Sequence, residues 1–203
     1  MTPEWWAFRS GLKPALRLPL GTRESEAARA LPHVVYGTFL YLADELAPLE
    51  KAARLESSAS ASERAQGCAL LGRLLGYPEC CQRRFLERLH RGVHQAANGE
   101  QAHEDFVAVE DALSHSGRCH ARLAHLLRGG VAPLISHYPC RYDCPASLAY
   151  AAEVLKVYEK EEPSAARALV DAFGTGVAVD REGRRHPPER APKDAAVVVF
   201  DAF

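Results

Sequence analysis

The sequence predicts a mainly α-helical chain: a compact helical domain followed by a C-terminal β-hairpin. Apolar residues recur at three- and four-residue steps in several segments, which is the spacing of one buried helix face. Proline and glycine stand where these segments begin and end. The pattern changes near the end of the chain, where two short runs rich in valine and alanine are typical of strands. We therefore expect a helical domain over residues 1–174 and a hairpin over residues 175–203 docked on it, because an isolated hairpin is marginal in water.

The first part of the chain is expected to cover the core rather than form it. Residues 1–21 carry both tryptophans among leucines and prolines, which indicates an irregular N-terminal arm laid over the helices. Thr22 is placed to cap a short helix that Pro32 ends. Val34, Val35, Phe39, Leu42 and Leu46 then recur at helical spacing, which predicts a second helix up to Pro48.

The central segments are predicted to be helices with clear ends. Residues 64–75 have helical spacing, and Gly76 suits a left-handed C-terminal cap. Pro78 suits the first turn of a helix that runs to about residue 91, and Pro145 suits the start of a later one. Helices are also expected over residues 106–128 and 163–174, with a loop over residues 92–104.

Composition excludes several classes of protein. With 203 residues, of which 47% are hydrophobic and 25% charged, the chain can bury one good core. A formal net charge of −1 excludes the strong field of a nucleic-acid coat or a polybasic membrane binder. The apolar runs are too short for a bilayer span, and no export signal is visible, so we expect no membrane association and a cytoplasmic location. In that reducing compartment the six cysteines are expected to be ligands, reactive thiols or core residues rather than disulfide partners.

Two cysteine motifs carry the chemistry. Tyr77-Pro78-Glu79-Cys80-Cys81 and Tyr138-Pro139-Cys140-Arg141-Tyr142-Asp143-Cys144 each place cysteines after a Tyr-Pro pair, where a helix is expected to begin. The unpaired N–H groups and partial positive charge of a helix start favour the thiolate form. Two such ends that face each other would hold four thiolates, the number that zinc and iron–sulfur clusters require. We therefore predict that Cys80, Cys81, Cys140 and Cys144 form one metal-binding site.

The spacing favours an iron–sulfur cluster of the 4Fe–4S type, with a redox or sulfur-handling role. Adjacent cysteines on a helix point about 100° apart, which is awkward for one small ion. Cys140 and Cys144 are separated by three residues, a wider gap than in the usual zinc knuckle. Two alternatives stay open: a structural zinc module that supports binding to a partner or nucleic acid, and a metal-free thiol enzyme with Cys80 as nucleophile and Cys81 as resolving thiol.

Three other side chains are candidates for the same site. His137 could be a ligand or a proton donor, and Arg84 and Arg141 could orient a small anionic substrate, although such arginines are by default a solvated helix face. A redox partner protein is the other expected partner. Cys68 lies on a leucine-rich helix face and is expected to fill core space, whereas Cys119 could add a ligand. The sequence leaves open whether the chain is an enzyme, and it carries no phosphate-binding loop, dinucleotide turn or nucleophile elbow.

The two motifs also resemble a prokaryotic family of uncharacterised proteins. Its members pair a Leu-Gly-Tyr-Pro-x-Cys-Cys element, here Leu75 to Cys81, with a Pro-Cys-x-x-x-Cys element, here Pro139 to Cys144. Arg141 departs from the small polar residue that the resemblance leads us to expect. The resemblance implies only that the four cysteines belong to one site.

Overall fold

The computed structural model of the chain describes residues 1–90, 111–112, 114–117, 119–123, 132–173, 177–179, 185–186 and 198–200. These residues form mainly α-helices, with two small antiparallel sheets. The described elements are α1 (Pro3–Arg9), β1 (Ala15–Pro19), α2 (Arg23–Ala28), β2 (His33–Tyr36), β3 (Phe39–Ala43), α3 (Leu46–Glu56), α4 (Ala61–Leu74), α5 (Glu79–His90), the 3-10 turn η1 (Ala121–Leu123), α7 (Pro145–Glu161), α8 (Pro163–Phe173), β4 (Val177–Val179), β5 (Arg185–His186) and β6 (Val198–Phe200). The mainly α prediction is confirmed, although the chain also holds an N-terminal sheet that the sequence analysis did not predict.

The prediction of an irregular arm over residues 1–21 is wrong. Thr2 accepts a hydrogen bond from the Trp5 backbone N–H and Pro3 takes the first turn, so α1 forms at once. Strand β1 then pairs antiparallel with β3, from Ala15 opposite Ala43 to Pro19 opposite Phe39. Pro19 is tolerated because β1 is an edge strand of the β1-β3-β2 sheet.

The predicted helix over residues 34–48 is also wrong, because strands β2 and β3 occupy most of this range. Gly37 adopts a φ of +57° between the two strands, a conformation that suits glycine. Leu40, Tyr41 and Leu42 are all buried. Leu40 and Leu42 pack with Trp5 and Ala28, while Tyr41 packs on the other face against α3 and α4 residues. A strand covered on both faces gives a continuous apolar run, and periodicity alone cannot distinguish this run from a buried helix.

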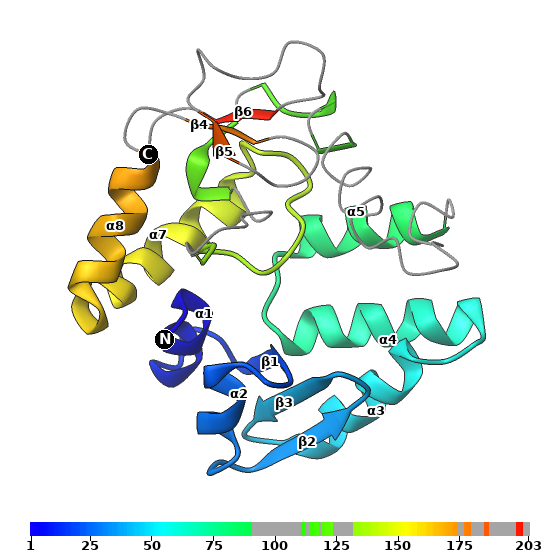
Figure 1. Cartoon of the computed structure of the whole chain (residues 1–203). Helices are drawn as coiled ribbons and strands as arrows, with labels where there is room; N and C mark the ends of the chain where they lie inside the picture. The colour runs from blue at the N-terminus through cyan, green and yellow to red at the C-terminus, as the bar shows by residue number, and fades with distance from the viewer. Residues whose placement is uncertain are drawn as a thin grey trace.

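The helices near the cysteine motifs follow the sequence predictions closely. Helix α4 ends before Gly76, which has a φ of +72°. The chain then turns at Pro78 into α5. Cys144 is the N-cap of α7, and Pro145 is its first residue. Figure 1 shows α5 and α7 above the N-terminal sheet, with α4 between α5 and that sheet.

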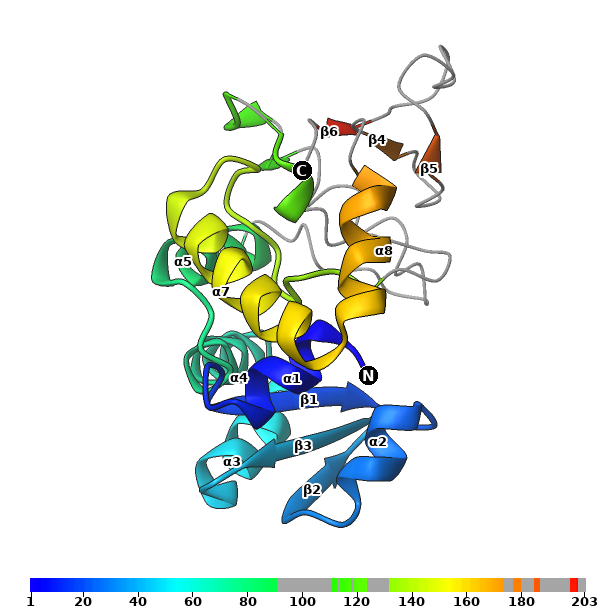
Figure 2. The same ribbon diagram turned by 90° about the vertical axis from the view of Figure 1, so that its left-hand side faces the viewer.

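The C-terminal strands are described only in part. Strand β4 pairs antiparallel with β6 on one side and with β5 on the other. Strands β4 and β6 lie within the two runs that predict the hairpin, and β5 lies between these runs, but most of residues 174–203 are outside the described residues. The complete hairpin and its docking on the helices therefore stay predictions. Figure 2 shows the three strands beyond the C-terminal end of α8.

One hydrophobic cluster surrounds the cysteine motifs. Buried Cys81 and Cys144 belong to it, together with Tyr142, Ala151 and other residues of α7 and α8. Half-buried Cys80 and Cys140 pack against its edge. The candidate site therefore lies at the edge of a core and not on a surface loop.

Candidate metal centre

The four predicted cysteines meet in one place. Cys80 and Cys81 lie in the first turn of α5, while Cys140 precedes the turn that leads to Cys144 at the start of α7. One sulfur from each residue lies within 4.8 Å of every other one. All four thiols are free of disulfide bonds. Within the described part of the chain, these four residues form the only group of cysteine, histidine or acidic side chains with a spacing that could hold a metal ion.

The sulfur atoms of Cys80, Cys81 and Cys144 are spaced at nearly equal distances. The Sγ atom of Cys144 lies 3.6 Å from that of Cys80 and 3.8 Å from that of Cys81. The Sγ atoms of the tandem pair, Cys80 and Cys81, are 3.9 Å apart. The tandem pair therefore presents both sulfurs to the same point, although the two residues are neighbours on one helix.

Two neutral groups hold the sulfur of Cys81. The backbone N–H of Cys140 donates a hydrogen bond to it over 3.4 Å, and the Ser147 hydroxyl lies 3.2 Å away. The starts of α5 and α7 both face the cluster, so their partial positive charges favour negative charge on the sulfurs. Backbone donors and helix starts together make this place suitable for thiolates.

The thiols of Cys81, Cys140 and Cys144 differ in pKa because they are hydrogen-bonded to one another. Hydrogen bonds with Cys140 and Cys81 hold the pKa of Cys144 far below its usual range. Hydrogen bonds with Cys140 and Cys144, followed by burial, raise the pKa of Cys81. A hydrogen bond with Cys144 is also the first cause that raises the pKa of Cys140 to about 11. The lowered pKa of Cys144 favours its thiolate, and a cation that replaces the protons of Cys81 and Cys140 would allow these two to ionise as well.

The structure places His137 beside the centre and not among its sulfurs. His137 is buried, and its Nε2 atom lies 2.8 Å from the Ser147 hydroxyl, which in turn contacts Cys81. His137 therefore reaches Cys81 through one intervening hydroxyl. Ser147 was not predicted as a site residue, although its position three residues after Cys144 in the same helix was a usable signal.

The two candidate arginines are held by carboxylates. Arg84 binds both oxygens of Asp111, with distances of 2.8 and 2.7 Å, and also pairs with Glu87. Arg141 is about half exposed and pairs with Asp143 at 3.2 Å. Both arginines lie near the centre, and their first partners are acidic residues of this chain.

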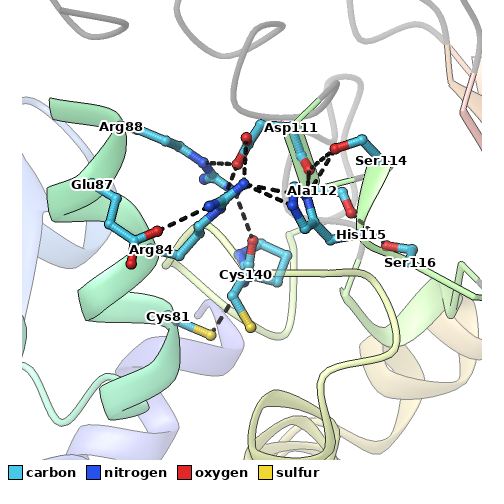
Figure 3. A network of polar contacts seen from close by, with 11 residues as sticks. Cys81, Arg84, Glu87, Arg88, Asp111, Ala112, Ser114, His115, Ser116 and Cys140 are labelled. Carbon is cyan, nitrogen blue, oxygen red and sulfur yellow. Dashed lines mark hydrogen bonds and ion pairs between the residues drawn. The ribbon is translucent and has the colours of Figure 1, made fainter. Parts of the chain in front are cut away.

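A third segment, which sequence reasoning missed, contacts both α5 and the turn between Cys140 and Cys144, and Figure 3 shows its contacts with α5. Asp111 binds Arg84 and Arg88 of α5. A few residues later, Ser116 accepts a hydrogen bond from the Tyr142 backbone N–H, and the Gly117 N–H donates to Asp143. Asp111, Ser116 and Gly117 thus connect the helix that carries Cys80 and Cys81 to the turn between Cys140 and Cys144. The spacing of Arg84 and Arg88 on one helix face was a signal, but nothing local pointed to Asp111 as their partner.

The remaining two cysteines lie outside the group of four. Cys68 is half-buried in α4, where burial raises the pKa of its thiol to about 11. It lines a cavity of about 140 Å³, and Cys81, Tyr77 and His137 also line this cavity. Cys119 is half-buried and packs against the core cluster. The structure therefore gives neither residue a place among the ligand atoms.

Comparisons with protein-family models, curated proteins and solved structures found no match. The family resemblance of the two cysteine motifs thus stays a prediction from the motif positions. Among the described helices, none combines the length and apolar character needed to cross a bilayer. Fold and site together define a mainly helical protein with a four-cysteine group that could bind a metal.

Proposed function

We propose that the chain binds one metal ion through the thiolates of Cys80, Cys81, Cys140 and Cys144. The spacing of the sulfurs carries this proposal. A tetrahedral ion with metal–sulfur bonds of about 2.3 Å requires sulfurs about 3.8 Å apart. The distances between Cys144 and the tandem pair, and within that pair, are 3.6, 3.8 and 3.9 Å.

Zinc is the ion that best fits this donor set. Four thiolates in a tetrahedral arrangement favour zinc among the common divalent metals. Four protein ligands also close the coordination shell, which is typical of a structural site rather than a catalytic one. In this role the ion would join the start of α5 to the start of α7, and a module stabilised in this way could support binding to a partner or a nucleic acid.

An iron–sulfur cluster is the second candidate, with the redox or sulfur-handling role that the sequence favours. A cubane cluster binds each thiolate through a separate iron, so its outer sulfurs lie farther apart than around one ion. Cys80 and Cys140 are only half-buried, which is compatible with the larger volume of a cluster. A small anionic substrate or a redox protein would then be the partner.

Anaerobic purification followed by elemental analysis tests the proposal and separates its two forms. The single-ion form predicts one zinc per chain, a colourless protein and no acid-labile sulfide. Several irons per chain with equal sulfide and a brown colour would establish the cluster instead. Full-length protein that holds no metal, and in which one low-pKa thiol reacts with alkylating agents, would reject both forms in favour of a thiol enzyme.

A further inference from the structure

Arg88 is a buried cation in contact with the segment that leads into Cys140. Its side chain is fully buried. Its Nε donates to an Asp111 oxygen over 2.6 Å, and its Nη2 donates to the Pro139 carbonyl over 3.4 Å. Its Nη1 has no hydrogen-bond partner among the described residues. A buried guanidinium is costly unless charge and hydrogen bonds compensate it, so its surroundings need a source of negative charge.

Asp111 compensates this charge only in part. Its carboxylate is shared with Arg84, which binds both of its oxygens (Figure 3). Among the described residues, the two arginines share this one carboxylate, and only Glu87 adds a second. Glu87 binds Arg84 from the other side, but about half of its side chain is exposed, so solvent weakens its effect. The proposed centre carries negative charge, because four thiolates outnumber the two charges of a divalent ion.

We propose that Arg88 is a positioning residue for the metal centre, which holds the backbone directly before Cys140 and places a positive charge beside it. The contact with Pro139 acts on the residue directly before Cys140. The backbone N–H of Cys140 in turn donates to the sulfur of Cys81. A shift of Pro139 would therefore disturb one ligand directly and a second through its hydrogen bond. This proposal rests on the proposed function, since it requires that the centre binds a metal.

Arg84→Met is a matched control for Arg88→Met. Both arginines lie on the same face of α5, one turn apart, and both bind Asp111. In the described structure only Arg88 contacts Pro139. Both variants therefore lose one positive charge and the Asp111 partner; Arg84→Met also loses the half-exposed Glu87 pair, whereas only Arg88→Met loses the contact that leads to Cys140. Arg88→Lys keeps the positive charge but lacks the planar guanidinium group with its fixed hydrogen-bond donors.

Titration of the metal-free full chain with Co²⁺ measures both affinity and the number of thiolate ligands. The wild-type chain must first give the visible spectrum of tetrahedral cobalt bound to four thiolates, and its absence would reject the proposed function itself. We expect Arg88→Met to bind Co²⁺ about 10- to 100-fold more weakly, the usual effect of losing an outer partner of a metal ligand, with weaker sulfur-to-cobalt absorption. Arg84→Met should keep the wild-type spectrum and most of the affinity, and Arg88→Lys should lie between the two.

The proposal is overturned if Arg88→Met matches Arg84→Met in both affinity and spectrum. Circular dichroism and a urea titration show whether Arg88→Met still folds. If it does not, Asp111→Asn replaces it, because this change loosens Arg88 and keeps its side chain. The same loss of sulfur-to-cobalt absorption is then expected, and an unchanged spectrum and affinity in Asp111→Asn would equally overturn the proposal.

Discussion

The thiols of Cys80 and Cys144 lie 3.6 Å apart, although 64 positions separate the two residues in the chain. Each thiol stands at the start of a different helix. Two helix starts that converge on one sulfur group bring together like partial charges, which repel each other unless negative charge lies between them. The stability of the fold therefore depends on the negative charge that the site holds.

Cys144→Ser should abolish stoichiometric metal binding, because three thiolates remain where four are expected. Serine still suits the N-cap of α7, so the helix should begin at the same residue. The measurement is zinc per chain after equilibration with excess metal and gel filtration. Cys68→Ser is the control, since Cys68 lies outside the group of four, and it should retain one zinc per chain. Equal zinc in the two variants would contradict the assignment of Cys144.

Removal of the metal should destabilise the site and leave the N-terminal sheet intact. When the free ion concentration is a thousand times its dissociation constant, binding stabilises the folded state by about 4 kcal/mol. A chelator would remove this stabilisation. Hydrogen exchange should then speed up at the start of α5 and over residues 140–148. The β1–β3 pair has a separate core around Leu16 and Leu42 and should keep its protection. Equal acceleration in both regions would show that the metal does not act locally.

The Asp111 ion pairs should make the stability of the folded state depend on pH at acidic values. Burial would raise the pKa of Asp111, but hydrogen bonds from Arg88 and Arg84 outweigh it and lower the pKa from 3.8 to about 2. A lowered carboxyl pKa adds stability that is fully present above the unfolded value and is lost as the pH falls through the folded value. Asp111→Asn should therefore be less stable than the wild type at pH 7, by about 3 kcal/mol, because Arg88 loses its charge partner.

This difference in stability should shrink as the pH falls from about 4 towards 2, where the wild-type carboxyl becomes protonated. Urea unfolding of the metal-free chain at a series of pH values measures it. Asp171→Asn, at an exposed position of α8, serves as the control for a lost carboxylate. A difference that stays constant down to pH 2 would show that the charge of Asp111 does not stabilise the fold.

Gly67→Ala should disrupt the packing of α3 against α4. A Cβ atom at Gly67 would lie 2.1 Å from the backbone nitrogen of Glu56, which cannot move without shifting α3. Overpacking of this kind costs about 1–3 kcal/mol or more. Gly72→Ala on the same helix is the control, because its Cβ would meet only the Gln82 side chain, at 3.2 Å or more. Thermal unfolding should show a much lower midpoint for Gly67→Ala, and similar midpoints would contradict the close crossing.

Capping residues, glycine and proline in the sequence predicted where several helices begin and end, because these ends depend on neighbouring residues. Thr22, Gly76 and Pro145 mark helix ends in the structure as they do in the sequence. The grouping of four cysteines followed from two motifs of the same kind. Strands β2 and β3 were mistaken for a helix because the apolar residues of β3 are buried on both faces, a fact that only the tertiary structure reveals. Arg88 and Asp111 were missed for a related reason: their pairing joins segments that no local pattern connects.

X-ray absorption spectroscopy of the full chain loaded with its native metal tests the central claim most directly, because it counts and measures the bonds to the metal. A single ion held by the four cysteines predicts one shell of four sulfurs at about 2.3 Å and no second metal nearby. Nitrogen or oxygen atoms in that shell, or a metal neighbour that indicates a cluster, would contradict a single ion bound by Cys80, Cys81, Cys140 and Cys144.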